Sequence, residues 1–355
     1  LLAQLTDRSG MIVSPKAAQA AGANFGAKPV CAGPFKFVER VAQDRIVVER
    51  FADYWNKDEI NFYRITYLPI VDSTVRLANL RAGQLDFIER MAASDAASVG
   101  RDDKLKLSKI VELGYQGITI NTGKSDQGKN SALGKDPRVR EAFELSLDRD
   151  AIIQVVMEGE AVPGNQYVAP GNPFYGKGSP LPKRDVNRAK QLLRDAGIPN
   201  PSFTMMTATT SEAQKISQVV QAMVKESGFD MKIQSTEFAT ALDLADKGNF
   251  EALILAWSGR ADPDGNTQQF LQCNAPQNYS GYCNADVDKA INDARTAGDP
   301  AARAKLYEQV AAQVNKDRPI VYLFHRNWLW AYSAKLAGLR TVPDGLVRVQ
   351  GLKFN

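Results

Sequence analysis

The sequence predicts an α/β fold, and three observations lead to this expectation. Short strand-like runs alternate with stretches of helical periodicity along most of the chain. With 355 residues the chain can form two sizeable cores, and 44% hydrophobic and 24% charged residues is an ordinary globular composition. Neither an internal repeat nor low-complexity sequence is visible. We therefore expect a sheet covered by helices, with a smaller, separate sheet region before it.

Charge and hydropathy bear on the partners of the protein. Its 44 basic and 40 acidic residues give a net charge of +4, with the signs mixed along the chain and no basic block. Nucleic-acid surfaces need clustered Lys and Arg, so no nucleic-acid partner is expected. No window approaches the roughly 18 consecutive apolar residues of a membrane span, which predicts a soluble chain. The sequence starts at Leu1 without a leader, so we expect either that a signal peptide was removed or that the chain is a fragment.

The first part of the chain predicts a small sheet and a β-helix-β unit. Residues 35–40 and 45–50 alternate like strands on either side of a short polar turn and indicate a hairpin. A strand over 62–71 then leads into a helix over 73–83, which Gly83 ends. A short strand over 84–89 completes the unit.

The later part predicts the alternation that defines the fold class. A strand over 114–122 is followed by one helical segment over 136–159, with Asp136 as its N-cap and Pro137 at the first helical position. The Pro- and Gly-rich stretch over 163–182 is long enough for a binding loop. The remaining elements expected are helices over 185–197, 212–228, 238–250 and 300–319 and strands over 202–210, 231–238, 252–257 and 320–325.

Trp257 and Arg260 end the apolar strand 252–257 in the sequence Trp-Ser-Gly-Arg. A strand that ends in this way places the indole ring of Trp257 and the guanidinium of Arg260 at the carboxyl edge of a sheet, where α/β folds bind ligands. The guanidinium of an arginine pairs with both oxygens of a carboxylate. The alternative is that Arg260 only bridges Asp262 or Asp264.

Asp262 and Asp264 admit a catalytic and a structural interpretation. Glycoside hydrolysis needs two carboxyl groups held several ångströms apart across the substrate. The sequence Asp-Pro-Asp-Gly, however, has turn-forming residues at each position, and Asp side chains commonly bond to their own backbone. We favour the turn.

His325 is the sole histidine, which excludes a metal site built on two imidazoles, and we interpret it as structural. Neither a nucleophile elbow nor a phosphate-binding loop is present. Cys273 and Cys283 flank a short loop that can fold back on itself, so we predict a disulfide between them and an oxidising compartment. The alternatives are two unrelated free thiols and a metal site, although neither a His nor a further Cys lies nearby in the sequence. Cys31 is left unpaired, and neither a metal nor a cofactor is expected.

The order of the segments resembles that of the extracytoplasmic solute-binding proteins, family 5, which serve ABC importers of peptides, nickel and opines. The resemblance covers nearly the whole chain. Each matching stretch alone is weak evidence for the family, but all of them in the family's order are specific evidence. The stretches are AGPFKFVER, FADYWNK, DSTVRLANLRAGQLDFIE, GYQGITINTGK, DPRVREAFELSLDRDAII, NRAKQLLRDAGIP, AWSGRADPDGN, NYSGYCNADVDKAINDA and VPDGLVRVQGLKF.

The resemblance implies a periplasmic-binding-protein-like fold of two lobes that closes on a ligand without catalysis. Residues 1–117 would form part of the first lobe, 118–326 the whole second lobe, and 327–355 a segment that returns to the first. Family members carry a further block of the first lobe ahead of this sequence, so we expect a fragment of a longer precursor. A partner of Cys31 would lie in that block.

The resemblance also places the ligand. Peptide-binding members carry an aspartate for the ligand ammonium three residues after the tryptophan, and here that position is Arg260. Dipeptide binders place an arginine for the ligand carboxylate after the strand that corresponds to 202–207, and here Thr209 and Thr210 stand there. We therefore expect an anionic or N-blocked ligand whose carboxylate meets Arg260. The alternative is that Asp262 binds an ammonium.

Further contacts follow from the resemblance with less support. Trp257 stacks on the ligand in relatives, although it could equally close the core. The other expected contacts lie in two loops, where ordinary loop chemistry is the alternative: Asn165, Gln166, Tyr167, Asn278 and Tyr279.

The expected function is the binding component of an ABC importer. It would capture a small peptide-like or other carboxylate-bearing solute in the periplasm, as a monomer, and deliver it to a permease in the inner membrane. Two alternatives remain open. One is a secreted hydrolase that uses Asp262 and Asp264, and the other is a metal- or haem-binding member of the family that uses His325.

Overall fold

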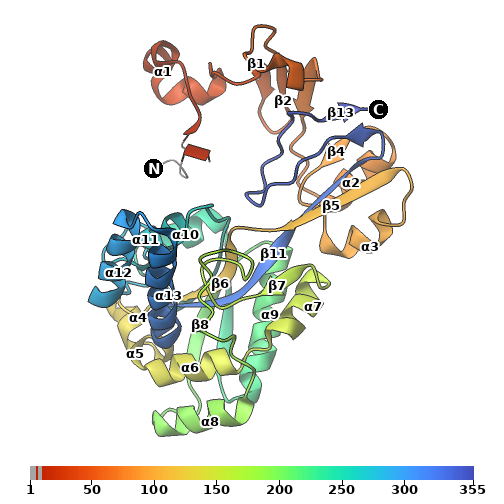
Figure 1. Cartoon of the computed structure of the whole chain (residues 1–355). Coiled ribbons are helices and arrows are strands. Elements are labelled where there is room, and N and C mark those ends of the chain that lie inside the picture. The colour runs from red at the N-terminus through yellow and green to blue at the C-terminus, as the bar shows by residue number, and fades with distance from the viewer. Residues whose placement is uncertain (1–4, 7–9) are drawn as a thin grey trace. The chain divides into compact units, whose positions relative to one another are not determined.

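The computed structural model describes residues 5–6 and 10–355 and divides the chain into two compact units (Figure 1). Unit one comprises Leu1–Ile110 and Trp328–Asn355, and unit two comprises Val111–Asn327. The chain passes between the units at 110/111 and 327/328, near the lobe limits predicted at 117/118 and 326/327. The assignment of a partial and a complete lobe stays a prediction.

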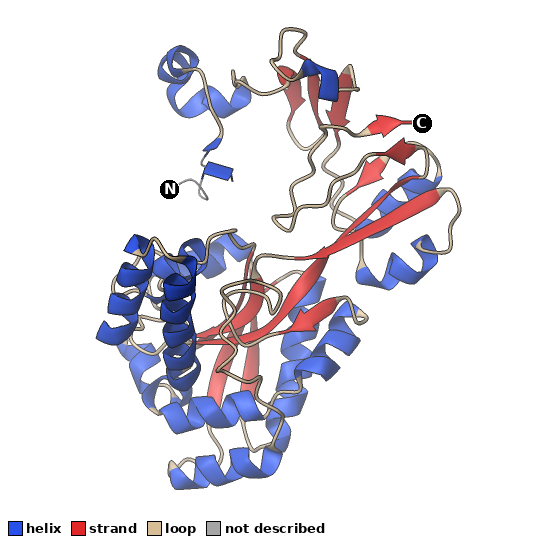
Figure 2. Cartoon of the chain, viewed as in Figure 1, coloured by secondary structure: helices blue, strands red, loops and turns tan. Residues whose placement is uncertain are grey.

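Unit two contains the sheet that the later part of the sequence predicts (Figure 2). Strand β10 pairs antiparallel with β6 and parallel with β8, and β8 pairs parallel with β9. Strand β11 pairs antiparallel with β6 and with the short β7. The strands of this sheet are β6 (Tyr115–Ile120), β7 (Ala161–Pro163), β8 (Ser202–Ala208), β9 (Asp230–Thr236), β10 (Ala252–Trp257) and the first part of β11 (Ile320–Ser333).

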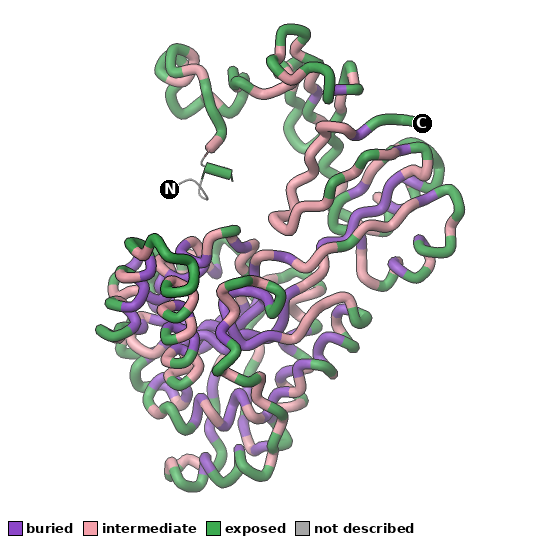
Figure 3. The backbone as a smooth tube through the Cα atoms, in the orientation of Figure 1, coloured by how far each residue is buried: buried purple, intermediate pink, exposed green. Residues whose placement is uncertain are grey.

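Helices cover both faces of this sheet, so its strands are largely buried (Figures 1 and 3). Val321 and Leu323 of β11 pack in the cluster with helices α6 to α9, whereas Ile320 and Tyr322 pack with α11 to α13. This period of two is that of a strand buried on both sides. The helices are α4 (Asp126–Asn130), α5 (Ala132–Lys135), α6 (Pro137–Leu145), α7 (Arg149–Met157), α8 (Val186–Asp195), α9 (Ser211–Glu226), α10 (Phe238–Asp246), α11 (Asp264–Leu271), α12 (Ala285–Thr296) and α13 (Pro300–Asp317).

Unit one contains the predicted hairpin, which β3 extends to a three-stranded antiparallel sheet. The second part of β11 pairs with β4 there, and helix α2 packs Leu77 and Leu80 against Leu329 of this strand. The elements are α1 (Pro15–Ala21), β1 (Phe35–Val41), β2 (Arg45–Arg50), β3 (Arg64–Tyr67), α2 (Ser73–Arg81), β4 (Phe87–Ile88), α3 (Ala96–Val99), β5 (Leu105–Val111), β12 (Leu336–Ala337) and β13 (Lys353–Phe354), with short 3-10 helices at Gly22–Ala27, Lys57–Glu59 and Ala93–Asp95. No helix in the described part of the chain is long and apolar enough to cross a membrane.

One predicted helix is wrong, because residues 136–159 form two helices. Asp136 and Pro137 begin α6 as expected, but this helix ends at Leu145. Asp148 then accepts a hydrogen bond from the amide of Ala151 and caps α7. The sequence Leu-Ser-Leu-Asp interrupts the periodicity with an N-cap residue, which ends one helix and starts the next.

Other elements differ in length. Strand β3 covers only Arg64–Tyr67 of the expected 62–71, and β4 only Phe87–Ile88 of 84–89. Strand β11 runs through Ser333, well beyond the expected end at 325, because its second part pairs with β4 in unit one. Several elements were not predicted, among them helices α1, α3, α4, α5, α11 and α12 and strands β5, β7, β12 and β13.

Candidate functional site

The carboxyl ends of three parallel strands lie at one edge of the sheet in unit two. Strand β8 is followed by α9, β9 by α10 and β10 by α11. Since these strands run in the same direction, the residues that follow each of them meet at this edge. The predicted residues Thr209, Thr210, Trp257 and Arg260 are therefore brought to one side of unit two.

Trp257 is partly exposed and lies between an aromatic ring and a cation. Its ring centroid is 4.9 Å from that of Phe270 in an edge-to-face arrangement. The guanidinium carbon of Arg260 lies 4.4 Å from the Trp257 ring centroid, in cation–π contact. The indole Nε1 donates a hydrogen bond of 2.8 Å to Asn266 Oδ1. Trp257 thus closes the core beneath the loop and also supports Arg260.

Arg260 is partly exposed and is held by its backbone as well as by its stack on Trp257. Its amide donates a hydrogen bond of 2.7 Å to Asn266 Oδ1, and its carbonyl accepts one of 3.0 Å from Asn266 Nδ2. Its Nη1 donates to the carbonyl of Gly259 at 2.7 Å. The sequence revealed Arg260 but not the role of Asn266, although Asn266 lies only six residues further along the chain.

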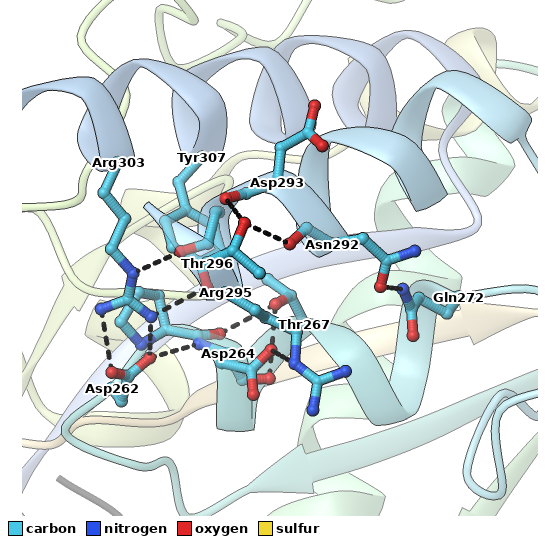
Figure 4. A network of polar contacts seen from close by, with 12 residues as sticks. Asp262, Asp264, Thr267, Gln272, Asn292, Asp293, Arg295, Thr296, Arg303 and Tyr307 are labelled. Carbon is cyan, nitrogen blue, oxygen red and sulfur yellow. Dashed lines mark hydrogen bonds and ion pairs between the residues drawn. The ribbon is translucent and has the colours of Figure 1, made fainter. Parts of the chain in front are cut away.

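Asp262 forms a bidentate ion pair with Arg303 of α13 (Figure 4). Its carboxylate also accepts a hydrogen bond of 2.9 Å from the amide of Asp264, which is the backbone bond expected of an Asx turn. Burial on its own raises the pKa of Asp262, but the hydrogen bonds from Arg303 and from this amide outweigh burial and lower the pKa.

Asp264 begins helix α11 and lies 3.2 Å from the Nε of Arg295 of α12 (Figure 4). Its side chain is buried, which raises its pKa, while the charge of Arg295 opposes the shift. The predicted turn is therefore the entry into a helix, and each of the two aspartates is paired with an arginine from a distant part of the sequence. Neither Arg295 nor Arg303 carries a local signal that predicts this pairing.

Thr209 and Thr210 are exposed after strand β8. The Thr210 hydroxyl caps α9 by accepting a hydrogen bond of 3.4 Å from the amide of Ala213. The Thr209 carbonyl accepts one of 3.4 Å from Gln214 Nε2. Both threonines shape the start of α9 at the same edge of the sheet as Trp257.

Asn165, Gln166 and Tyr167 are fully buried, and their polar atoms are bonded within the protein. Asn165 donates to the carbonyls of Ser179 and Pro180, Gln166 makes two hydrogen bonds to the backbone of Gly176, and the Tyr167 hydroxyl donates to the carbonyl of Tyr307. These bonds fasten the long loop to itself and to α13. A ligand contact by these three residues stays a prediction.

Asn278 and Tyr279 are also buried, in the loop between the two paired cysteines. Asn278 Nδ2 donates to the carbonyls of Gln272 and Tyr282, and Tyr279 packs in the cluster with helix α10. The predicted disulfide is confirmed, with the sulfurs of Cys273 and Cys283 2.03 Å apart. Cys31 is exposed and is the one free cysteine in the described part of the chain.

His325 lies in β11 with no exposed surface, and its Nδ1 is 2.5 Å from the carbonyl oxygen of Gly114. Because a carbonyl only accepts, Nδ1 carries the proton. Burial lowers the pKa of His325 to about 4, although the hydrogen bond to Gly114 opposes this shift. Among the described residues, no group of three or more His, Cys, Asp or Glu side chains is arranged to hold a metal ion.

An ionic cluster that the sequence did not reveal lies where β11 leaves unit two. Arg326 contacts Glu112 at 3.3 Å and Glu212 at 3.1 Å, and it donates to Gln116 Oε1 at 3.1 Å. Glu112 is buried, and desolvation raises its pKa to about 7 in spite of the charge of Arg326.

Two comparisons by sequence identify relatives of the chain. The model of the family described as "Bacterial extracellular solute-binding proteins, family 5 Middle" matches residues 2–278. The oligopeptide-binding protein AppA of Bacillus subtilis is 29% identical over 338 residues, which cover 89% of this chain and 60% of that protein. The glutathione-binding protein GsiB of Pectobacterium atrosepticum is 27% identical over 354 residues, which cover 96% of this chain and 67% of that protein. The chain thus spans about two thirds or less of the length of these relatives.

Solved structures share the fold. The dipeptide-binding protein of Pseudoalteromonas sp. SM9913, in complex with Met-Leu, superposes with a TM-score of 0.83 at 20% identity, covering 97% of this chain and 69% of that one. AppA of Bacillus subtilis, in complex with a nonapeptide, gives 0.76 at 27% identity, covering 91% and 66%. The predicted periplasmic-binding-protein-like α/β fold is therefore confirmed. The family model, which matches more than half of the sequence, shows that the chain belongs to the bacterial extracellular solute-binding proteins, family 5.

Proposed function

We propose that this chain captures a peptide-like solute bearing a carboxylate and delivers it to the permease of an ABC importer. The relatives named for oligopeptides and for glutathione support a ligand of the peptide class. Glutathione is itself a small peptide with two carboxylates and one ammonium group. An excess of carboxylates is the ligand chemistry that an arginine at the position of Arg260 would favour.

Arg260 is the observation that carries this proposal. It follows a strand that ends at the carboxyl edge of the sheet, and its guanidinium is oriented by the stack on Trp257. In this role the guanidinium donates paired hydrogen bonds to the two oxygens of the ligand carboxylate. The nearby Asp262 is less suited to bind an ammonium group, because Arg303 already contacts both of its oxygens.

We further propose that the protein binds without catalysis. A glycosidase needs one carboxyl group that protonates the leaving group and a second that attacks or activates water. Asp262 and Asp264 are instead each paired with an arginine, and together they form the entry to α11. The disulfide between Cys273 and Cys283 supports an extracytoplasmic location, where we expect the protein to act as a monomer.

Native mass spectrometry of the purified protein tests the proposed class of ligand. We expect a non-covalent adduct of a few hundred daltons that is lost on denaturation and carries at least one carboxylate. A ligand without an acidic group would contradict the assignment of Arg260. Detection of a cleaved product that accumulates with time would contradict a binding protein without catalysis.

Calorimetric titration measures the contribution of Arg260 directly. The probe is S-methylglutathione, because its blocked thiol cannot exchange with Cys31 or with the disulfide. We expect Arg260→Ala to weaken binding about 10- to 100-fold, which corresponds to the loss of a charged hydrogen-bonded pair. Arg188→Ala removes the same charge from the exposed face of α8 and is the matched control, for which we expect unchanged affinity. Equal effects of the two variants would contradict the proposal.

A further inference from the structure

Two residues in the first turn of α11, Gly265 and Asn266, contact Arg260. Asn266, with no exposed surface, bonds to both the amide and the carbonyl of Arg260. The same Oδ1 atom accepts the indole proton of Trp257. One buried side chain therefore fixes the backbone of Arg260 and the ring on which its guanidinium stacks.

Gly265 provides the space for the Arg260 side chain. A Cβ atom at this position would lie 2.6 Å from Arg260 Cγ and 2.8 Å from Cβ. Such distances are far below van der Waals contact, and these atoms belong to the base of the side chain, so Arg260 would have to move. The backbone of Gly265 itself is ordinary helix, which an alanine adopts more readily than a glycine.

We infer that Gly265 and Asn266 are positioning residues that hold the Arg260 guanidinium on Trp257 and so set the preference for a carboxylate-bearing ligand. This inference rests on the ligand role proposed for Arg260. An arginine that is already ordered loses less conformational entropy when a ligand binds, and its planar guanidinium is held in one orientation. Through Gly265 and Asn266, recognition of the ligand carboxylate therefore depends on the first turn of α11.

Gly265→Ala separates positioning from stability. Alanine favours the helix and so offsets part of the cost of moving Arg260. A purely structural role predicts a changed melting temperature with an unchanged preference for S-methylglutathione over its diamide. We expect the fold to be retained while the affinity for S-methylglutathione falls about three- to tenfold, the scale of ordering one flexible side chain. The diamide of the same peptide, which lacks both carboxylates, should bind the variant as it binds the wild type. Gly298→Ala is the control, since no atom lies within 4 Å of its new Cβ.

Trp257 fluorescence tests the position of Arg260 without any ligand. We expect Gly265→Ala and Arg260→Ala to shift the emission in the same direction, because each removes the guanidinium or its support from the indole. Asn266→Ala should shift it as well, but this variant also removes the hydrogen bond that the indole donates, so the comparison rests on Gly265→Ala. The shifts should vanish in a Trp257→Phe background, which isolates this ring from Trp55, Trp328 and Trp330. Circular dichroism establishes that each variant is folded, and Gly265→Ala decides the test if Asn266→Ala does not fold.

The outcomes separate this inference from the proposed function. If the wild type binds S-methylglutathione no better than its diamide, the proposed role of Arg260 is wrong. Gly265 and Asn266 then cannot set a preference for carboxylates. If the wild type prefers the carboxylates and Gly265→Ala leaves that preference unchanged, the positioning role is wrong. Unshifted Trp257 emission in Gly265→Ala overturns the positioning role whatever the wild type binds.

Discussion

Arg303 holds Asp262 through two parallel hydrogen bonds, with its terminal nitrogens 2.7 and 2.9 Å from the two carboxylate oxygens. The side chains are only 19% and 18% exposed, and 41 residues separate them in the sequence. This ion pair joins the entry of α11 to α13 (Figure 4). It also fixes the start of the segment that contains Gly265 and Asn266.

Asp262→Asn is expected to lower the free energy of unfolding by about 1–3 kcal/mol, because a mostly buried guanidinium loses its carboxylate partner. Chemical denaturation at pH 7 measures this loss. Asp293→Asn breaks the exposed ion pair with Lys289 and is the control, with an expected change below about 0.5 kcal/mol. If Asp262→Asn instead abolished binding of S-methylglutathione at unchanged stability, Asp262 would be the ammonium site.

Glu112 is expected to make stability fall as the pH rises from about 5 to 8. Its folded-state pKa of about 7 lies above the ordinary value of 4.5, chiefly because of desolvation. The folded protein therefore holds this proton more tightly than the unfolded chain. Its contribution is fully present below the ordinary pKa and is lost as the pH passes through 7.

Glu112→Gln, which cannot titrate, should remove this dependence. Urea unfolding at several pH values measures the free energy of unfolding of both proteins. We expect the variant to gain stability relative to the wild type as the pH rises. Parallel stability curves would show that Glu112 does not titrate in this range.

His325 is expected to add sensitivity to acid. Burial lowers its pKa from 6.5 to about 4, so the folded state opposes protonation. The stability that it contributes is present above 6.5 and is lost as the pH falls through 4. His325→Asn keeps a donor for the carbonyl of Gly114 and should flatten this part of the pH profile.

Thermal unfolding between pH 7 and 4 compares this variant with the wild type. The same measurement with Ni²⁺ or Zn²⁺ tests the metal-binding alternative. That alternative would be revived if the metal raised the melting temperature of the wild type but not that of His325→Asn.

The disulfide between Cys273 and Cys283 is expected to stabilise the protein by about 3 kcal/mol, on the basis of the short loop that it closes. The double variant Cys273→Ala with Cys283→Ala should unfold at lower denaturant concentration. Cys31→Ser is the control, because this thiol is exposed and free. A dithiol reductant should lower the stability of the wild type and leave the double variant unaffected.

The elements that follow local rules could be predicted from the sequence. The hairpin of β1 and β2, the strand β10 and the helix α8 with its Asp185 cap appear close to their expected bounds. Their signals are alternation, helical period and capping residues, which act over a few residues. The split between α6 and α7 was missed because the cap at Asp148 competes with an otherwise continuous periodicity.

The sequence by itself determined the α/β class, the order of the main elements and the pairing of Cys273 with Cys283. The exchange of an acidic for a basic residue at Arg260 stays a prediction. Only the tertiary structure decided which charges pair. Arg303 and Arg295 reach Asp262 and Asp264 because α12 and α13 pack beside α11 on one face of the sheet. The burial of Asn165, Gln166 and Asn278 was likewise decided by packing. Ion pairs and burial depend on contacts between segments distant in the chain, and neither spacing nor residue type encodes such contacts locally.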